Sequence, residues 1–125
     1  MREKLLKSED VFSILLARDM EGYHNLIKLS SIGYTEGFYR KPRVDHEVLA
    51  KHSSGLIVSS ACLAGEIAQS LMKDDWNQAR ETANWYGEVF ENRYYLEVQA
   101  HESEGQPELN GKIFTLADEL GLPVI

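Results

Sequence analysis

The stretch Gly55-Leu-Ile-Val-Ser-Ser-Ala-Cys62-Leu-Ala-Gly-Glu66-Ile67 is the part of the sequence on which the predicted fold and the candidate site depend most. Its short apolar run, residues 56–58, follows a glycine and precedes small residues, which is typical of a fully buried strand. The only cysteine of the sequence comes next, and a helical pattern begins near Glu66. The stretch therefore predicts a strand, a tight turn that carries a thiol, and the start of a helix.

Cys62 is the candidate functional residue of this stretch. In α/β folds, ligands and metals bind just beyond the carboxyl ends of strands. A helix N-terminus beside the thiol would also favour its thiolate form. The alternative is that Cys62 is an inert buried side chain, because free cysteine is among the most buried residue types. The residues alone leave both interpretations open.

Composition and charge narrow the class of protein. The chain has 125 residues, 43% of them hydrophobic, which fits one domain or a piece of one. The formal net charge of −7 argues against nucleic-acid binding through the overall field. One cysteine suits a reducing cytoplasm, and no apolar run approaches the ~20 residues that span a membrane. We therefore expect a cytoplasmic protein with no membrane partner, in which the charged segment 1–10 is flexible or helical.

Hydrophobic periodicity predicts strands alternating with helices. Further strands are expected at 11–17, 93–99 and 122–125, with helices at 19–37, 45–52, 66–73, 75–90 and 107–120. Because helices separate the strands, the pattern implies parallel strands joined by right-handed crossovers. Four strands are few for a closed barrel. We therefore expect an α/β segment of a larger barrel, or an open sheet of about four strands.

Helix boundaries and buried faces can also be read from single residues. Asp75 suits the N-cap of a helix, Pro107 suits a first turn, and Gly121 suits a C-terminal stop. The expected buried stripes are Tyr23, Leu26, Ile27 and Tyr34 on helix 19–37, Ile67, Leu71 and Met72 on helix 66–73, and Trp76, Ala79, Ala83, Tyr86 and Phe90 on helix 75–90.

Polar loops supply further candidates. The loop Arg40-Lys41-Pro42-Arg43 could contact phosphate or a neighbouring domain, or could simply be a solvated loop. His101, Glu102 and Glu104 follow a strand and could approach the same edge as Cys62, although a histidine in an acidic loop is more often exposed. Asp74-Asp75 fits helix capping better than catalysis.

Motifs of known catalytic sites are absent from the sequence. It contains no phosphate-binding glycine loop, no nucleophile elbow and no Cys-x-x-Cys pair. Residue chemistry alone therefore gives no complete active site. A stand-alone α/β binding domain without catalysis remains one interpretation.

Several segments together resemble a known family. They are residues 15–31, Glu36-Gly-Phe-Tyr-Arg-Lys-Pro-Arg-Val-Asp45, residues 55–67, Tyr95-Leu-Glu-Val-Gln-Ala-His101 and Leu120-Gly-Leu-Pro-Val-Ile125. In this order they resemble the PHP (polymerase and histidinol phosphatase) domain of bacterial replicative DNA polymerase III alpha subunits, from about Phe12 onward. The resemblance implies that residues 1–125 are a partial PHP domain, an internal fragment of a distorted seven-stranded β/α barrel.

The resemblance also implies a metal site in part of the family. Members that keep it hold up to three ions at the carboxyl ends of the strands and can support phosphoesterase or proofreading chemistry. Cys62 matches the cysteine ligand of the family. Phe12 stands where metal-keeping members carry a histidine, and a phenyl ring cannot coordinate a metal. Zinc or manganese would therefore bind Cys62 only with ligands from outside this chain, since one thiolate cannot hold the ion.

The function expected from the resemblance is that of a polymerase module. The parent protein would be a DNA-directed DNA polymerase, a nucleotidyltransferase of DNA replication, and its PHP module would be mainly structural, with a degenerate metal site. The alternative is a metal-dependent phosphoesterase or proofreading module that uses Cys62. The implied partners are the remainder of the alpha subunit, other replisome subunits and DNA. The isolated fragment is expected to be inactive, to need no cofactor and to self-associate through strand edges and apolar surface.

Overall fold

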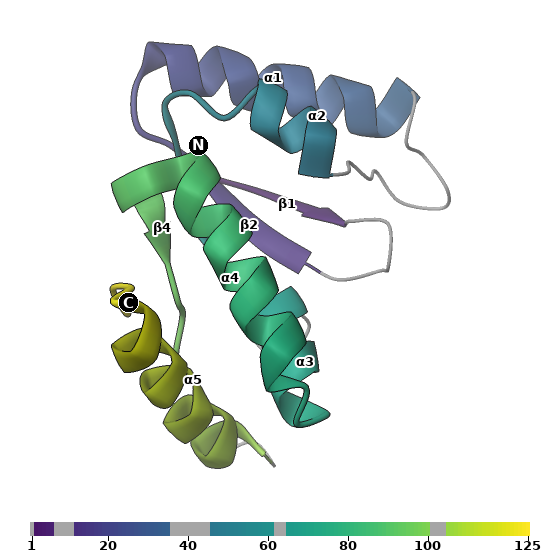
Figure 1. Ribbon diagram of the computed structural model, residues 1–125. Coiled ribbons are helices and arrows are strands. Elements are labelled where there is room, and N and C mark those ends of the chain that lie inside the picture. The colour runs from purple at the N-terminus through teal and green to yellow at the C-terminus, as the bar shows by residue number, and fades with distance from the viewer. Residues whose placement is uncertain (1, 7–11, 36–45, 62–64, 101–104) are drawn as a thin grey trace.

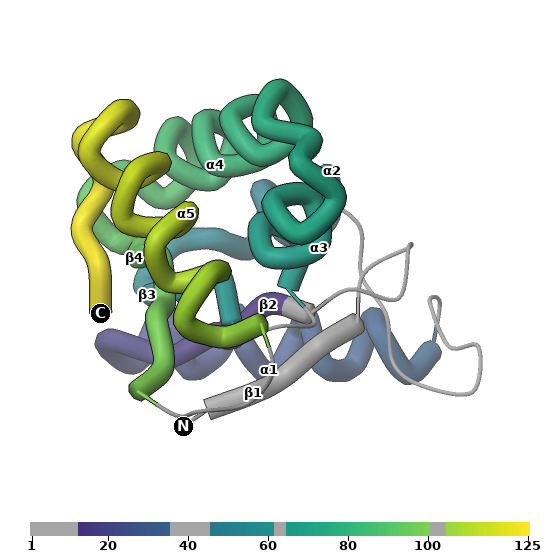
Figure 2. The backbone as a smooth tube through the Cα atoms, turned by 90° about the horizontal axis from the view of Figure 1, so that it is seen from below, coloured from purple at the N-terminus to yellow at the C-terminus, as the bar shows by residue number. Residues whose placement is uncertain are grey.

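The computed structural model describes residues 2–6, 12–35, 46–61, 65–100 and 105–125. The elements in chain order are β1 (Arg2–Leu6), β2 (Phe12–Ala17), α1 (Met20–Thr35), α2 (His46–Lys51), β3 (Leu56–Ser59), α3 (Glu66–Met72), α4 (Trp76–Phe90), the 3₁₀ turn η1 (Glu91–Arg93), β4 (Tyr94–Tyr95) and α5 (Gln106–Leu120). Figures 1 and 2 show α3, α4 and α5 grouped together, with α1 apart from them at the margin of the molecule.

The strands form one sheet in the order β1-β2-β3-β4. β3 and β4 are parallel, as the sequence predicts, with Val58 opposite Tyr94. Past β4 the chain continues the pattern: Leu96 makes a parallel bridge with Val124, and its N–H donates to the Pro123 carbonyl at 2.9 Å. The second half of the chain therefore has the expected parallel arrangement.

The first half of the chain does not have this parallel arrangement. β2 pairs with β3 in the antiparallel direction, with Ala17 opposite Leu56, and β1 pairs with β2 in the same way. The prediction of parallel strands throughout was wrong here, because α1 leads the chain away from the end of β2 and β3 begins back at that end, with Leu56 opposite Ala17. The described part of segment 1–10 is also a strand, where a flexible or helical segment was expected.

The core is one cluster of buried side chains that come from β2, β3, β4 and all five helices. The stripe predicted on α4 faces it: Ala79, Ala83, Tyr86 and Phe90 are fully buried and Trp76 is half-buried. The Tyr86 ring stacks on the Tyr94 ring of β4, with centroids 4.8 Å apart. The α4 stripe is therefore core, and its aromatic rings fix the helix against the end of β4.

The buried face of α1 differs from the predicted one. Leu26 is buried as expected, but Ile27 and Tyr34 are exposed, and the other buried residues are Gly22, Leu29 and Gly33. Gly22 lies against the backbone of Gly55 so closely that an added Cβ would overlap the Gly55 carbonyl. The helix is rotated so that its small residues, and not only its apolar ones, face the sheet.

The ends of individual strands and helices agree only in part with the prediction. β4 is shorter than the predicted strand 93–99, and Met72 at the end of α3 is exposed. Pro107 lies in the first turn of α5, and Gly121 ends it with φ 68°, both as predicted. None of the helices in the described ranges is long and apolar enough to cross a membrane.

Candidate functional site

The candidate site lies at the edge of the sheet where β3 and β4 end. β2 is antiparallel to β3, so its first residues reach the same edge, and Ile14 lies opposite Ser59. The Ser60 N–H donates to the Tyr95 carbonyl at 3.0 Å, which extends the β3–β4 pairing past the last strand residues. This edge collects hydroxyl and carboxylate side chains from several elements, in two hydrogen-bond networks.

The first network is centred on Glu66, the first residue of α3. One oxygen of its carboxylate, Oε1, accepts a hydrogen bond from the Tyr86 hydroxyl at 3.0 Å and lies 3.2 Å from His46 Nε2. The Tyr86 hydroxyl also lies 3.0 Å from Ser13 Oγ. We call Ser13, His46, Glu66 and Tyr86 the Glu66 network. It joins four elements, β2, α2, α3 and α4, that are far apart in the sequence.

Aromatic rings surround this network. The His46 imidazole stacks on the Trp85 indole, with centroids 4.1 Å apart, and meets the Tyr86 ring edge-on at 5.6 Å. His46 is 40% exposed, whereas the Glu66 side chain is only 16% exposed. α2 is therefore fastened to α3 and α4 through its first residue, by one polar and two ring contacts.

Tyr94 lies beneath the network. Its ring is 1% exposed, and its hydroxyl has no hydrogen-bond partner among the described residues. Burial, and to a lesser extent the negative charge of Glu66, raise the pKa of Tyr94 far above its ordinary value. The Tyr94 phenol therefore stays protonated and neutral.

The second network begins at Ser59, the last residue of β3. The Ser59 hydroxyl donates to Glu97 Oε1 at 2.6 Å, and the Glu97 N–H donates to Ser60 Oγ at 2.9 Å. Gln99 donates to the other Glu97 oxygen at 2.8 Å and is held in turn by Asn110 of α5. Both Glu97 oxygens are thus engaged, and α5 is fastened to the strand ends.

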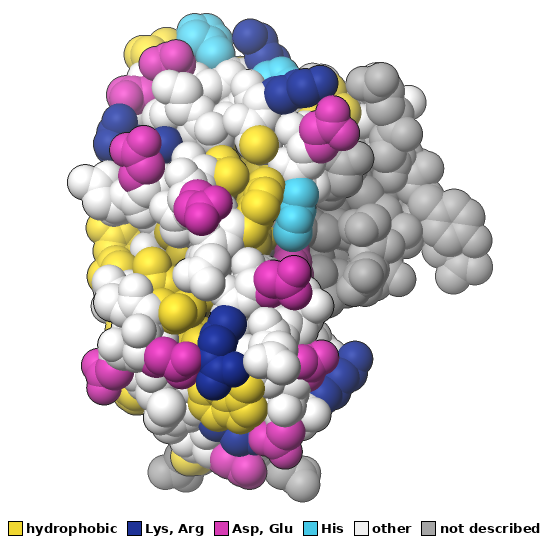
Figure 3. Space-filling view, in the orientation of Figure 1, with side chains coloured by type: hydrophobic (Ala, Val, Ile, Leu, Met, Phe, Trp, Pro, Cys, Tyr) yellow, Lys and Arg dark blue, Asp and Glu magenta, His cyan; other side chains and the backbone are white. Residues whose placement is uncertain are grey.

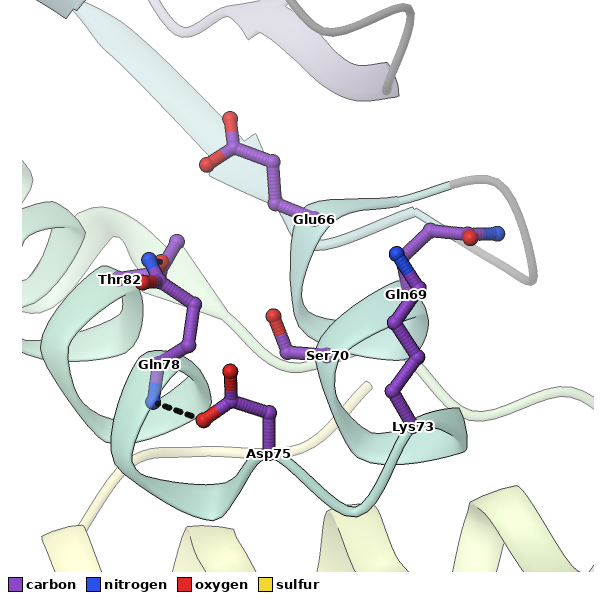
Figure 4. A pocket seen from close by; sticks show the side chains of 7 residues that line it. All are labelled: Glu66, Gln69, Ser70, Lys73, Asp75, Gln78 and Thr82. Atoms are coloured by element: carbon purple, nitrogen blue, oxygen red, sulfur yellow. Dashed lines mark hydrogen bonds between the residues drawn. The ribbon is translucent and has the colours of Figure 1, made fainter.

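A pocket of about 280 Å³ opens between α3 and α4. Its lining is polar and consists of Glu66, Gln69, Ser70, Lys73, Asp75, Gln78 and Thr82 (Figure 4). Asp75 Oδ1 accepts the Gln78 N–H at 3.1 Å, so this carboxylate caps α4 as the sequence predicts. Its neighbour Asp74 pairs with Lys112 Nζ at 2.7 Å and raises the pKa of that ammonium. These two acids have structural roles.

Several predicted site residues lie outside the described residues. They are Cys62, His101, Glu102, Glu104 and the loop 40–43, so the structure tests neither the ligand role of Cys62 nor the approach of His101 to it. The residues on either side of 62–64 are described. Ala61 has the left-handed φ of 63°, which is unfavourable for a residue with a side chain, and its N–H donates to Ser59 Oγ.

Within the described ranges, the side chains do not make a metal centre. No group of three or more His, Cys, Asp or Glu side chains is placed to hold an ion. His46 and Glu66 form a pair of potential donors, but the Glu66 oxygen that faces His46 also accepts a hydrogen bond from Tyr86. These donors by themselves do not fit a metal cluster of the kind that the resemblance implies.

Sequence reasoning missed Glu66, Tyr86 and Glu97 as polar residues of this edge. Tyr86 was predicted as an apolar core residue, which its ring is, and its hydroxyl carries the unexpected role. Glu97 could have been found, because alternation along 93–99 places it on the face opposite Leu96. Glu66 gave no signal beyond its place at a helix start.

Comparison with known proteins identifies the family. The family model of the PHP domain matches residues 5–101 of the sequence. The chain belongs to the PHP domain family. This domain carries the strand-end edge, since residues 5–101 include β2, β3 and β4.

Relatives of this PHP chain are subunits of a polymerase. The chain is 47% identical to the DNA polymerase III subunit alpha of Deinococcus radiodurans over 111 residues, 89% of this chain and 8% of the relative. It is 40% identical to that of Borreliella burgdorferi over 127 residues, 97% of the chain and 11% of the relative. The Thermus aquaticus subunit is 40% identical over 89% of the chain. The chain thus spans about a tenth of the length of these relatives.

Proposed function

We propose that residues 1–125 are part of the PHP domain of a bacterial DNA polymerase III alpha subunit, a cytoplasmic enzyme of DNA-directed DNA synthesis. The observation that carries this proposal is the 40–47% identity to such subunits over 89–97% of the chain. The catalytic chemistry of the polymerase would lie in the remainder of that protein. Its partners would be the other replisome subunits and DNA, while the isolated piece would be inactive.

The role we assign to this PHP segment is mainly structural. Two carboxylates at the strand-end edge, Glu66 and Glu97, are engaged by hydroxyl and amide groups of the protein itself. Half-buried charge that is hydrogen-bonded in this way fastens elements together and is costly to disrupt. Phe12, which stands where metal-keeping members have a histidine, supports the same interpretation. The segment would then form part of a distorted seven-stranded barrel that stabilises the polymerase.

A second candidate function is a metal-dependent phosphoesterase or proofreading site that uses Cys62. The left-handed backbone of Ala61 favours it, because unfavourable backbone conformations cluster at functional turns. Zinc or manganese would then be held by Cys62 together with ligands from outside this chain.

The first test is the reading frame that encodes the chain. The proposal predicts that the frame continues past Ile125 into a polymerase catalytic region, and that its product extends a primed DNA template. A frame that stops at Ile125 would instead support a stand-alone α/β binding domain. A longer product without primer extension would leave the PHP family membership intact and refute the polymerase assignment.

A further inference from the structure

Polar faces of α3 and α4 border the pocket between these two helices. The lining residues are three or four positions apart along each segment, so each set shares one side of its helix. The set on α3 and its C-cap is Glu66, Gln69, Ser70 and Lys73, and the set on α4 and its N-cap is Asp75, Gln78 and Thr82. Neighbouring helices usually meet through apolar stripes. Here two polar faces border a hollow of about 280 Å³.

Three of the lining side chains are charged, and they lie on separate sides of the hollow. Figure 4 shows Glu66, Lys73 and Asp75 around the space, with Ser70 between them. The ion pairs within the described ranges do not include Lys73, although it shares the pocket with two carboxylates. Asp75 uses one oxygen, Oδ1, to cap α4, and no described cation pairs with it. Lys73 and Asp75 therefore line one hollow without forming an ion pair with each other.

The pocket has an inner part and a mouth. Thr82 is buried, and Glu66 and Ser70 are half-buried, so these three residues form the inner part. Lys73 and Asp75 are exposed and form the mouth. The inner part thus offers one negative charge and two hydroxyl groups, and the mouth offers one charge of each sign.

The lining restricts the class of ligand. Its described residues include no apolar side chain and no aromatic ring, so neither an apolar molecule nor a nucleobase finds a packing surface. Two carboxylates against one ammonium disfavour an anion. The volume lies below the range of about 300–1,000 Å³ that holds drug-sized ligands. A small polar molecule with more positive than negative charge therefore fits this pocket.

Charges farther away do not alter this preference. On the face of the molecule drawn in Figure 3, acidic and basic side chains are interspersed, with no broad area of one sign. Exposed charges are also screened beyond about 8 Å at physiological salt. The side chains of the pocket itself therefore decide which charges the ligand carries.

We infer that the pocket between α3 and α4 binds a free basic amino acid, with L-arginine as its model. The cationic end of the ligand lies in the inner part, where the Glu66 carboxylate and the Ser70 and Thr82 hydroxyl oxygens accept its hydrogen bonds. At the mouth, Lys73 binds the α-carboxylate and Asp75 binds the α-ammonium group. The two positive charges and one negative charge of the ligand then match the two negative charges and one positive charge of the lining. The inference goes beyond the proposed function and does not depend on it.

Calorimetric titration of the full-length protein with L-arginine tests the inference. We expect saturable, stoichiometric binding of L-arginine and similar binding of L-lysine. L-citrulline has a neutral group in place of the guanidinium, and N-acetyl-L-arginine amide has no charged backbone groups. Each should bind at least about fivefold more weakly than L-arginine, because each lacks charges that the lining pairs.

Three outcomes of the titration would overturn the inference. The first is that L-arginine does not bind saturably. The second is that L-citrulline binds as tightly as L-arginine, because the inner carboxylate would then have no role. The third is that N-acetyl-L-arginine amide binds as tightly, which would point to an arginine residue of a polypeptide as the occupant.

Two neighbouring acids provide matched variants. Asp75→Asn removes a charge from the mouth but keeps a side-chain oxygen that can cap α4. Asp74→Asn removes the same charge from the preceding residue, which pairs with Lys112 and does not line the pocket. We expect Asp75→Asn to weaken L-arginine binding about fivefold and Asp74→Asn less than about twofold. Equal effects of the two substitutions would overturn the inference.

Lys73→Met tests the mouth independently of the cap on α4. Agmatine is the analogue of L-arginine that lacks the α-carboxylate. Lys73→Met should weaken the binding of L-arginine about fivefold and leave that of agmatine unchanged or stronger, because only L-arginine presents a carboxylate to Lys73. Thermal unfolding checks that the variant is folded. Equal weakening for both ligands would overturn the inference.

Discussion

Two helices make up the connection that leads into β3, and two make up the connection that leads out of it, but the strands that the connections join differ in relative direction. β2 is joined to β3 through α1 and α2, and β3 is joined to β4 through α3 and α4. The first pair of strands is antiparallel and the second is parallel. Two helices between strands therefore do not fix the relative direction of the strands.

The difference is the number of times that the chain runs the length of the sheet between one strand and the next. α1 has 16 residues, about 24 Å of helix, and leads away from the end of β2. The chain then returns to the same end, where Arg18 N–H donates to the Gly55 carbonyl at 2.8 Å. Between β3 and β4 only α4 makes a long passage, since α3 has seven residues. One passage gives parallel strands and two give antiparallel strands.

The contact of Gly22 with Gly55 is where the antiparallel return closes, and it should be the most sensitive position of the fold. Gly22→Ala would drive a Cβ into the Gly55 carbonyl. Because both partners are backbone, we expect a loss of at least about 3 kcal/mol in the free energy of unfolding, measured by denaturant titration.

Gly111→Ala is the control for this change. Gly111 is exposed on α5, and an added Cβ meets nothing within 4 Å. The substitution should stabilise the protein by about 0.5–1 kcal/mol through helix propensity. If Gly22→Ala were as well tolerated as Gly111→Ala, the close return of the chain at α1 would be wrong.

Arg93 holds the start of β4 to the start of β3. Its Nη1 donates to the carbonyl oxygens of Ser53 and Leu56, both at 2.8 Å, from the turn just before β4. Arg93→Met should cost about 2 kcal/mol of unfolding free energy, because two carbonyl groups lose a charged donor. Arg80→Met, which removes an exposed pair with Glu119, should cost less than about 1 kcal/mol. Similar costs for the two would show that Arg93 does not hold β4 to β3.

Tyr86 and Tyr94 form a matched pair, because their rings stack and only one hydroxyl is bonded among the described residues. Tyr86→Phe should cost about 1–2 kcal/mol, since Glu66 and Ser13 both lose a partner. Tyr94→Phe should be neutral or slightly stabilising, because it removes a buried hydroxyl that no described residue bonds. The reverse order in thermal or denaturant unfolding would contradict the Glu66 network.

Alkaline pH tests the burial of the Tyr94 hydroxyl. The pKa of Tyr94 is raised in the folded state, so the unfolded chain releases this proton near pH 10 while the folded protein keeps it. The stabilisation is complete below pH 10 and is lost above it, at up to about 1.4 kcal/mol per pH unit. Tyr94→Phe should lose stability less steeply than the parent above pH 10. Identical slopes would mean that Tyr94 ionises in the folded protein.

Local features of the fold could be predicted because they depend on neighbouring residues. Asp75 as a cap, Gly121 as a stop and the stripe of α4 each follow from a few positions in the chain. The antiparallel pairing of β2 with β3 could not, since it depends on contacts between residues far apart in the sequence, such as that of Gly22 with Gly55. Nor could the Glu66 network, in which Ser13 and Tyr86 are 73 residues apart. The candidate ligand Cys62 remains a prediction, because it lies outside the described residues.

The metal content of the full-length polymerase tests most directly the claim that this PHP segment is a structural element. Zinc and manganese should be measured in the purified protein and in its Cys62→Ser variant, with primer extension as the check that both are folded. The account predicts well under one ion per chain in both proteins, together with unchanged primer extension. A stoichiometric ion that is lost on Cys62→Ser would contradict it and would favour the phosphoesterase or proofreading function.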